Sequence, residues 1–451
     1  MNFINTIITN FFTGHSRTVK AKKQIIYSFI LKGFSIVIGL AFVPLILNYL
    51  DAERYGIWLT LSSIIGWFSF FDFGLGNGLR NRFAEAIANN DHELARTYVS
   101  TTYAVLSATF IVVLIIFYIV NPFLNWQTIL NTHAVGSKEL KIVALMIFTF
   151  FILQFLFKLI GTIAMADQRP AVNSSLTLLG NLTAFIIIFI FTKTTKGSLI
   201  ILSTALSVAP VLVLVLATYF FFHTDYKKYI PSYKYIDLTK SKDLLGLGFK
   251  FFYVQVAAII FFSTTNFLIA QFANQESVAA YNIAFKYLFT VNMLYFIVLT
   301  PFWSAVTDAY SKNDYSWLKN SLRKLIMISG IMVIGLVILL LLSPYIYKIW
   351  IGDKLSIPFS LSLIITLYLI FQVVLAPFTN FINGFGKLKL GIYTITLQLI
   401  IFLPVAILLG HKFGAFGIVL SMVFVHLISL IVEPLQVYKL INQKAYGIWN
   451  K

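Results

Sequence analysis

The chain of 451 residues has no cysteine, and charged residues make up only 11% of it. Without cysteine the protein can form neither a disulfide framework nor a thiolate metal site. The six histidines are scattered and lack an HExxH or comparable spacing, so we expect no metal centre, and no hydrolase constellation is present. Residues 1–23 lack the apolar core and cleavage site of a signal peptide, so we expect no removable leader.

Polar surface is scarce as well. Hydrophobic residues make up 59% of the chain, aromatic residues 17%, and the mean hydropathy is +0.87. This composition leaves too little polar surface to coat a soluble globule, so it indicates an integral membrane protein. Long apolar runs such as residues 331–342 indicate helices, because the strands of a barrel would alternate in polarity over about 10 residues.

The apolar runs predict an all-α fold of about twelve transmembrane helices. A window of about 20 residues places the spans near 24–50, 55–79, 97–120, 140–165, 170–192, 198–222, 244–272, 278–306, 319–343, 356–382, 388–410 and 414–438. Placing both termini in the cytoplasm assigns most lysines and arginines to inside segments. The positive-inside rule therefore predicts cytoplasmic N- and C-termini.

The longest polar interruption, residues 223–243, separates two sets of six spans. We therefore predict five parts: an interfacial segment (1–23), a six-helix bundle (24–222), a basic linker (223–243), a second six-helix bundle (244–440) and a cytoplasmic tail (441–451). Residues 1–23 fit either a helix in the plane of the membrane surface or a frayed apolar tail. The lysines and tyrosines of the linker are typical of a loop lying on anionic lipid, and we expect no nucleic acid partner.

The two halves share a weak repeat. At an offset that aligns Arg96 with Lys319, the pairs Glu85-Ala86 and Asn90-Asp91 align with Asp308-Ala309 and Asn313-Asp314. An even number of spans between the copies gives them one orientation, so we predict two pseudo-symmetric bundles around a central cavity, related by an axis along the membrane normal. Chance similarity of two amphipathic helix ends is the alternative.

Residues 71–96 carry charge into an otherwise apolar span. Asp72 lies inside an apolar run, three glycines follow it, and then come Arg80, Arg82 and Glu85. A charged side chain at the centre of a membrane helix costs about 2.5–3.5 kcal/mol, so such residues usually face a protein interior or water. We interpret this segment as one wall of a polar cavity.

The nucleotide-binding motifs that these glycines suggest are incomplete. Gly74, Gly76 and Gly78 end a membrane helix and have no βαβ context for dinucleotide binding. Gly386 and Lys387 lack the serine or threonine of a phosphate-binding loop, so we expect no ATP binding.

Other charges also fall within the predicted spans, and most are basic. Lys32, Arg80, Lys250 and Lys286 are the candidate substrate-binding residues of a cationic cavity, and Asp72 and Asp308 are candidates for ion coupling or charge tuning. Lysine and arginine bind phosphate well, so the cavity suits an anionic headgroup.

Two simpler interpretations of these charges stay open. Lys250, like Lys158, lies close to the cytoplasmic side and can extend its ammonium to the interface. Lys32 and Asp72 can also neutralise each other as an interhelical pair.

The stretches LDAERYGIW (50–58) and FDFGLGNGLRNRFAEAIANND (71–91) resemble the polysaccharide and O-antigen flippase branch of the multidrug/oligosaccharidyl-lipid/polysaccharide exporter superfamily. The resemblance implies two six-helix bundles around a cationic cavity in the bacterial inner membrane. It implies movement of an undecaprenyl-diphosphate-linked oligosaccharide from the inner to the outer leaflet by alternating access, for O-antigen or capsule. It also implies membrane lipids and a polysaccharide polymerase machinery as partners, an ion gradient of H+ or Na+, and Lys32, Arg80 and Asp72 as cavity residues.

Two other functions remain as alternatives. An organic-cation exporter of the same superfamily would favour acidic cavity residues, whereas only Asp72 lies clearly within a span. A membrane polysaccharide polymerase or glycosyltransferase would need a catalytic domain or a large external loop, and the longest predicted outside connection is about residues 121–139. We therefore predict a transporter and not an enzyme.

Overall fold

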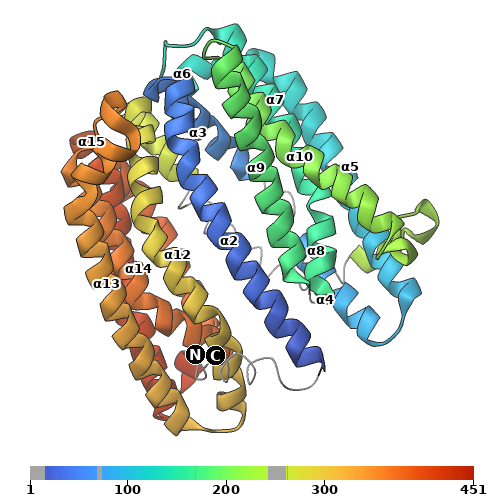
Figure 1. Ribbon diagram of the computed structural model, residues 1–451. Coiled ribbons are helices and arrows are strands. Elements are labelled where there is room, and N and C mark those ends of the chain that lie inside the picture. Colours follow the sequence, from blue (N-terminus) through green and yellow to red (C-terminus); the bar gives the residue numbers. More distant parts are fainter. Residues whose placement is uncertain (1–15, 69–73, 168, 242–260, 262, 451) are drawn as a thin grey trace, which may run out of the picture. The chain divides into compact units, whose positions relative to one another are not determined.

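The computed structural model describes the chain except for residues 1–15, 69–73, 168, 242–260, 262 and 451. In the described ranges the regular elements are helices, as Figure 1 shows, and the predicted all-α class is confirmed. The α-helices are α2 (Ser16–Tyr49), α3 (Ala52–Gly66), α4 (Leu75–Ala88), α5 (His92–Val120), α6 (Trp126–Leu130), α7 (Ser137–Phe157), α8 (Leu159–Ala166), α9 (Pro170–Thr194), α10 (Leu199–His223), α12 (Gln275–Ser311), α13 (Tyr315–Ile351), α14 (Phe359–Phe385) and α15 (Lys389–Ile441). The 3-10 turns are η2 (Asn121–Phe123), η3 (Lys227–Tyr229), η4 (Tyr233–Tyr235), η5 (Gly352–Lys354) and η6 (Gly447–Asn450).

Eight of the described helical segments are long and apolar enough to cross a membrane. One of them, α15, joins two helices at Gly414, where φ is 54° and ψ is −135°. Only glycine adopts such a backbone readily, so the chain bends where the predicted spans 388–410 and 414–438 meet. The eight segments are roughly consistent with the predicted twelve spans, since short or partly described helices are not among them.

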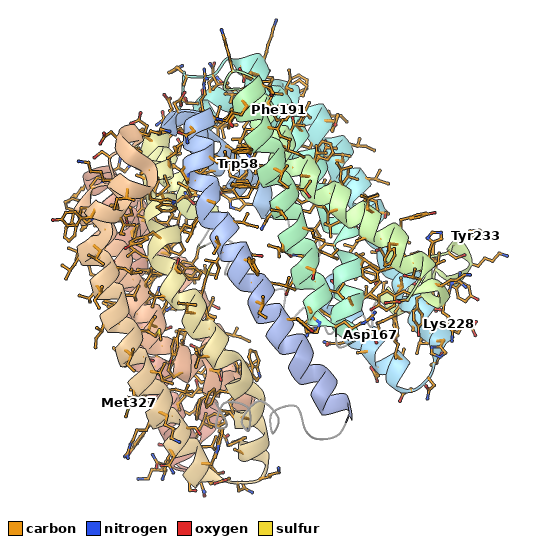
Figure 2. The ribbon with its side chains drawn as sticks, viewed as in Figure 1. Trp58, Asp167, Phe191, Lys228, Tyr233 and Met327 are labelled. Atoms are coloured by element: carbon orange, nitrogen blue, oxygen red, sulfur yellow. The ribbon has the colours of Figure 1, made fainter. Side chains whose placement is uncertain are left out.

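The surface of these helices is suited to lipid. Along α13, the side chains of Met327, Ile331, Ile334 and Ile338 are exposed and recur at helical spacing. Met327, which is 64% exposed, points away from the ribbon in Figure 2. An apolar stripe of this length would be costly in water, so it supports a multi-pass membrane protein.

The chain divides into two compact units. Unit 1 comprises Met1–Leu50, Ile65–Gln127 and Val135–Val256, and unit 2 comprises Asp51–Ile64, Thr128–Ala134 and Ala257–Lys451. In unit 1, α2 packs on α9, α9 and α7 pack on α10, and α4 packs on α5 and α8. In unit 2, α14 packs on α12, α13 and α15. The predicted division at the linker stays a prediction, and the structure adds that most of α3 groups with the C-terminal helices.

Side-chain amides hold this N-terminal part of unit 2 in place. Thr60 Oγ1 donates to Gln275 Oε1 at 2.8 Å, and Gln275 Nε2 donates to the carbonyl of Leu130. Gln271 Nε2 donates to the carbonyl of Ile129 at 2.7 Å. In an apolar environment unpaired amides are costly, so these bonds fix α3 and residues 128–134 to the start of α12.

A glycine allows the close approach of α3. A Cβ atom added to Gly56 would lie 1.8 Å from the carbonyl oxygen of Gln275 and 2.5 Å from its carbon. Small residues permit such backbone contact between membrane helices. We call this region, from Gly56 and Thr60 to Gln275, the α3–α12 contact.

The predicted repeat has a matching local structure. Asn90 and Asn313 both have a left-handed backbone, with φ of 59° and 56°. In the first copy the amide of Asp91 donates to the carbonyl of Ala86 at 2.9 Å, and in the second the amide of Asp314 donates to the carbonyl of Ala309 at the same distance. This is the Schellman helix ending, which asparagine tolerates better than most residues. The two turns therefore repeat bond for bond.

Each of these turns also starts a helix with an aspartate. Asp91 accepts a hydrogen bond from the amide of Leu94 at 2.9 Å, and Asp314 accepts one from Trp317 at 3.0 Å. Replacing either aspartate with alanine should lower the unfolding free energy by about 1 kcal/mol, because the first turn loses its cap. Thermal unfolding in detergent measures this, with Asp91→Asn and Asp314→Asn as controls that retain the cap. Equal melting temperatures for the alanine and asparagine variants would contradict it.

Candidate functional site

The structure describes the side chains of three of the six predicted site residues. Lys32 is exposed on α2, Arg80 is exposed on α4, and Lys286 is half-buried on α12. Asp308 lies in α12, but its side chain is outside the described part. Asp72 and Lys250 lie outside the described residues, so the proposed pairing of Lys32 with Asp72 stays a prediction.

Arg80 occupies the polar side of an amphipathic helix. Leu75, Leu79 and Phe83 recur at one-turn spacing on α4 and are buried, so they form the face that packs in unit 1. The helix begins after Gly74, whose φ of 78° favours glycine. Arg82 pairs with Glu85 at 2.8 Å, which leaves Arg80 as an exposed cation on this stretch.

Lys286 belongs to the less buried face of α12. Asn282, Lys286 and Thr290 follow one another at one-turn spacing and are half-buried, while Met293, three residues further on, is exposed. Ala284, Leu288 and Tyr295 on the opposite face are fully buried against the unit. Lys286 is therefore half-buried at the edge of the packed face of α12.

Asn282 begins a polar chain across three segments of unit 2. Its Nδ2 donates to Asn266 Oδ1 at 2.8 Å, and Asn266 Nδ2 donates to Ser63 Oγ at 2.8 Å. Ser63 lies on α3. This series of hydrogen bonds thus connects the face of α12 that carries Lys286 with the α3–α12 contact.

A second polar group of unit 2 surrounds His426 on α15. His426 Nδ1 donates to the carbonyl of Met422 at 2.8 Å, so Nδ1 carries a hydrogen. Its ring lies edge-on to Tyr368, with the centroids 5.0 Å apart, and Gln372 Nε2 donates to Tyr368 Oη at 2.5 Å. Tyr368 also lies near Phe285, the residue before Lys286. Sequence reasoning missed His426, since no spacing distinguishes it from the other histidines.

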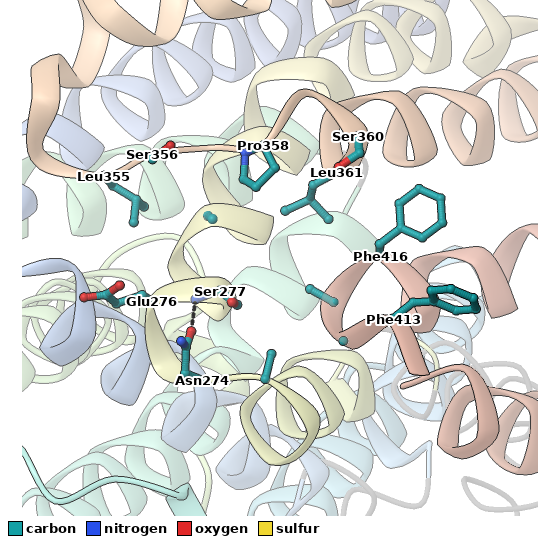
Figure 3. Close-up of a pocket in the computed structure, with 14 residues that line it drawn as sticks. Asn274, Glu276, Ser277, Leu355, Ser356, Pro358, Ser360, Leu361, Phe413 and Phe416 are labelled. Carbon is teal, nitrogen blue, oxygen red and sulfur yellow. Dashed lines mark hydrogen bonds between the residues drawn. The ribbon is translucent and has the colours of Figure 1, made fainter. Parts of the chain in front are cut away.

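A cavity of about 420 Å³ lies at the end of unit 2 where α12 and α14 begin (Figure 3). On one side of the cavity, the backbone amide of Ser277 donates a hydrogen bond to Asn274 Oδ1 at 2.8 Å. Two phenylalanines of α15, Phe413 and Phe416, line the other side of the cavity. Glu276 is the charged residue of its lining, and its carboxylate points away from the phenylalanines in Figure 3. The cavity lacks the positive charge that a diphosphate would need.

The linker packs on unit 1. The guanidinium of Arg96 donates through Nε to the carbonyl of Ile230 at 2.9 Å and lies over the ring of Tyr235, 4.3 Å from its centroid. The amide of Ser232 donates to Ser100 Oγ at 3.1 Å. The linker residues Lys228 and Tyr233 point outward in Figure 2. The start of α5 is therefore covered by the linker, whose Lys227, Lys228 and Lys234 remain exposed.

Acidic residues anchor both ends of the linker. Arg169 forms ion pairs with Asp167 and Asp225, and the hydrogen bond to Asp225 raises the pKa of the guanidinium. At the other end, the hydroxyl and the amide of Thr239 both donate to Asp237 Oδ1 and lower the pKa of that carboxyl group. Both shifts favour the charged form, of Arg169 at one end of the linker and of Asp237 at the other.

Within the described part of the chain, no three histidine, aspartate or glutamate side chains gather closely enough to hold a metal ion. The coupling ion stays a prediction, since a single carboxylate with backbone oxygens can bind a proton or Na+.

Comparison with known proteins identifies the family. Residues 21–305, more than half of the chain, match the family model described as polysaccharide biosynthesis protein. The chain belongs to this family. Residues 252–408 also match the MatE family model. The resemblance drawn from residues 50–58 and 71–91 is thereby confirmed.

Two relatives extend over most of this family member. A Yersinia pseudotuberculosis protein named for O-antigen export is 22% identical over 79% of this chain and 81% of its own length. A Salmonella typhimurium protein named as an O-antigen transporter is 22% identical over 81% of this chain and 84% of its own length.

Solved structures share the fold. An inward-facing multidrug resistance transporter of the MATE family has a TM-score of 0.71 at 15% identity and covers 93% of this chain and 100% of its own. The lipid II flippase MurJ, in an inward closed conformation, has a TM-score of 0.66 at 18% identity and covers 94% of this chain and 89% of its own. At these identities the likeness concerns the fold alone.

Proposed function

We propose that this protein is a flippase that moves an undecaprenyl-diphosphate-linked oligosaccharide from the cytoplasmic to the outer leaflet of the bacterial inner membrane, for O-antigen or capsule synthesis. The observation that carries the proposal is its place in the polysaccharide biosynthesis family, with relatives named for O-antigen export and transport over about four fifths of the chain. The excess of basic over acidic residues supports an anionic substrate.

The charges suggest how the substrate is held. The diphosphate is the part of the substrate that a cation attracts most strongly, and the sugars need a polar path through the membrane. Lys32, Arg80, Lys250 and Lys286 are the proposed contacts to the diphosphate. Lys32 and Arg80 are exposed, so a ligand can reach both, whereas Lys286 is half-buried on the less buried face of α12.

We further propose that transport uses alternating access driven by a gradient of H+ or Na+, with Asp72 and Asp308 in the coupling, and that neither ATP nor nucleic acid takes part. Membrane lipids surround the helices, both termini lie in the cytoplasm, and the product passes to a polysaccharide polymerase machinery. A carboxylate within or near a span is suited to coupling, because its charge changes when it binds a cation.

A test of the function uses purified protein in liposomes that contain a lipid-linked oligosaccharide. The rate at which the sugar becomes accessible on the opposite face should fall about 10-fold or more for Lys32→Ala and for Arg80→Ala, because each loses a charge-assisted contact to phosphate. Lys193→Ala, a change of an exposed lysine in the last turn of α9, is the matched control and should leave the rate unchanged. Retained folding is checked by gel filtration.

A second candidate function is export of organic cations, since the MatE model matches residues 252–408 and a MATE transporter shares the fold. The same liposomes, tested for uptake of a fluorescent organic cation, separate the two functions. Cation transport without flipping of the lipid-linked sugar would overturn the flippase proposal. Flipping without cation transport would support it, and full flipping activity in both alanine variants would assign Lys32 and Arg80 to structure only.

A further inference from the structure

A groove of about 600 Å³ opens on unit 2, between the start of α13 and the end of α15. Its lining combines two cations with an apolar wall and consists of Lys319, Leu322, Arg323, Ile326, Phe378, Pro434, Tyr438, Ile441 and Asn442. Neither Lys319 nor Arg323 has an ion-pair partner among the described residues, and both are exposed. The groove thus has unneutralised positive charge beside an apolar surface.

The groove lies where lipid headgroups meet acyl chains. Lys319 and Arg323 are one turn apart near the start of α13, and the uncharged, mostly apolar part of this helix begins at Leu325. Beyond the cations, the mouth of the groove is formed by Ile326 and Tyr438, which are 44% and 60% exposed. Exposed apolar side chains at this depth contact lipid, so the groove opens to the bilayer.

The internal repeat shows what covers the equivalent place in unit 1. Arg96 and Ser100 of unit 1 align with Lys319 and Arg323 of unit 2. In unit 1 these positions are covered by the linker, through the bonds to Ile230 and Ser232. In unit 1 the polar groups at the start of α5 therefore form hydrogen bonds with the linker, a segment of the same chain.

In unit 2 the equivalent segment takes another course. The tail that follows α15 turns back on that helix, where Lys439 lies 3.8 Å from the centroid of the Trp449 ring. Lys387 Nζ donates to the carbonyl of Asn450 at 3.0 Å. Among the described residues of the tail only Asn442 lines the groove. The place that the linker covers in unit 1 is thus left open in unit 2.

We propose that this groove binds an anionic phospholipid of the adjoining leaflet. The phosphate lies between Lys319 and Arg323, and an acyl chain lies along Ile326 and Phe378. A phosphodiester provides the negative charge that the two cations lack, and the chain covers the apolar wall that the tail leaves open. The bound lipid phosphate thus provides Lys319 and Arg323 with the polar contacts that the linker provides at the start of α5 in unit 1.

Native mass spectrometry of the intact protein in detergent, with added phosphatidylglycerol or phosphatidylcholine, tests the proposal. We expect wild type to retain phosphatidylglycerol preferentially. The double variant Lys319→Gln/Arg323→Gln should bind it about 30-fold more weakly, because each of the two basic residues contributes about fivefold to the binding of an anionic lipid. Lys324→Gln removes one exposed charge from the same helix outside the groove and should leave retention unchanged.

A further variant, Ile326→Trp, fills the apolar part of the groove and retains both cations. It should also reduce phosphatidylglycerol retention, which a purely electrostatic surface effect would not produce. Equal retention by wild type and the double variant would overturn the proposal, as would equal losses in the double variant and Lys324→Gln. Displacement of phosphatidylglycerol by undecaprenyl phosphate would assign the groove to the carrier lipid, and a dimer lost only in the double variant would assign it to a second copy of the chain.

Discussion

Gly56→Ala is expected to destabilise the protein by about 3 kcal/mol or more, the upper end of the range for overpacking in a close-packed interior. The added Cβ would lie 1.8 Å from the carbonyl oxygen of Gln275, which is a backbone atom and cannot rotate away. Relief would require separation of α3 from α12, and that would break the hydrogen bond between Thr60 and Gln275. The melting temperature in detergent, followed by tryptophan fluorescence, measures the loss.

Gly330→Ala is the control for this substitution. Gly330 is also helical and belongs to unit 2, but no atom lies within 4 Å of a Cβ placed there. Alanine is the better helix former, so the control should be as stable as wild type or slightly more stable. Equal unfolding temperatures for Gly56→Ala and Gly330→Ala would contradict the close backbone approach of α3 and α12 at Gly56.

Lys286→Met should lower the rate of flipping about 10- to 100-fold, the range expected when a hydrogen bond to a charged group is lost. Methionine retains the length and apolar stem of lysine, so the variant removes the charge with little change in packing. Lys286→Arg retains the charge and should preserve most of the rate. The liposome assay with a lipid-linked oligosaccharide measures all three proteins.

Lys158→Met provides a matched comparison for Lys286. Lys158 also falls within a predicted span, but it is exposed at the junction of α7 and α8, and an exposed lysine there can extend to the interface. Its loss should change the rate less than twofold. Similar rates for Lys286→Met and Lys158→Met would remove Lys286 from the proposed binding residues while leaving the flippase proposal intact.

Short sequence patterns predicted the features that depend on a few adjacent residues, such as helix ends and bends. The repeated Asn-Asp pair was recognisable because a left-handed asparagine and a capping aspartate are properties of a few adjacent residues, as at Asn90 and Asp91. The bend at Gly414 fell at a predicted gap between spans for the same reason. Membrane helices form their backbone hydrogen bonds within each segment, so the all-α class followed from composition and run length.

Contacts between distant segments left no such pattern. Thr60 and Gln275 are 215 residues apart, and nothing near either residue indicates the other. The environment of His426, with Tyr368 and Phe261 around its ring, likewise depends on three separate helical segments. The linker was identified by its polarity, but its course over α5 depends on the position of Arg96, which only packing determines.

The membership of residues 51–64 and 128–134 in unit 2 bears on how such genes can recombine. A crossover in the linker would join the first six spans of one homologue to the last six of another. Unit 2 of that hybrid would then combine segments with two different histories, with Gly56 and Thr60 from one parent facing Gln275 from the other. Such hybrids should fold only when both parents carry a small residue at position 56 and a matching hydrogen-bonding pair at positions 60 and 275. The two halves of the gene are therefore expected to be inherited together, although the halves of the protein resemble each other.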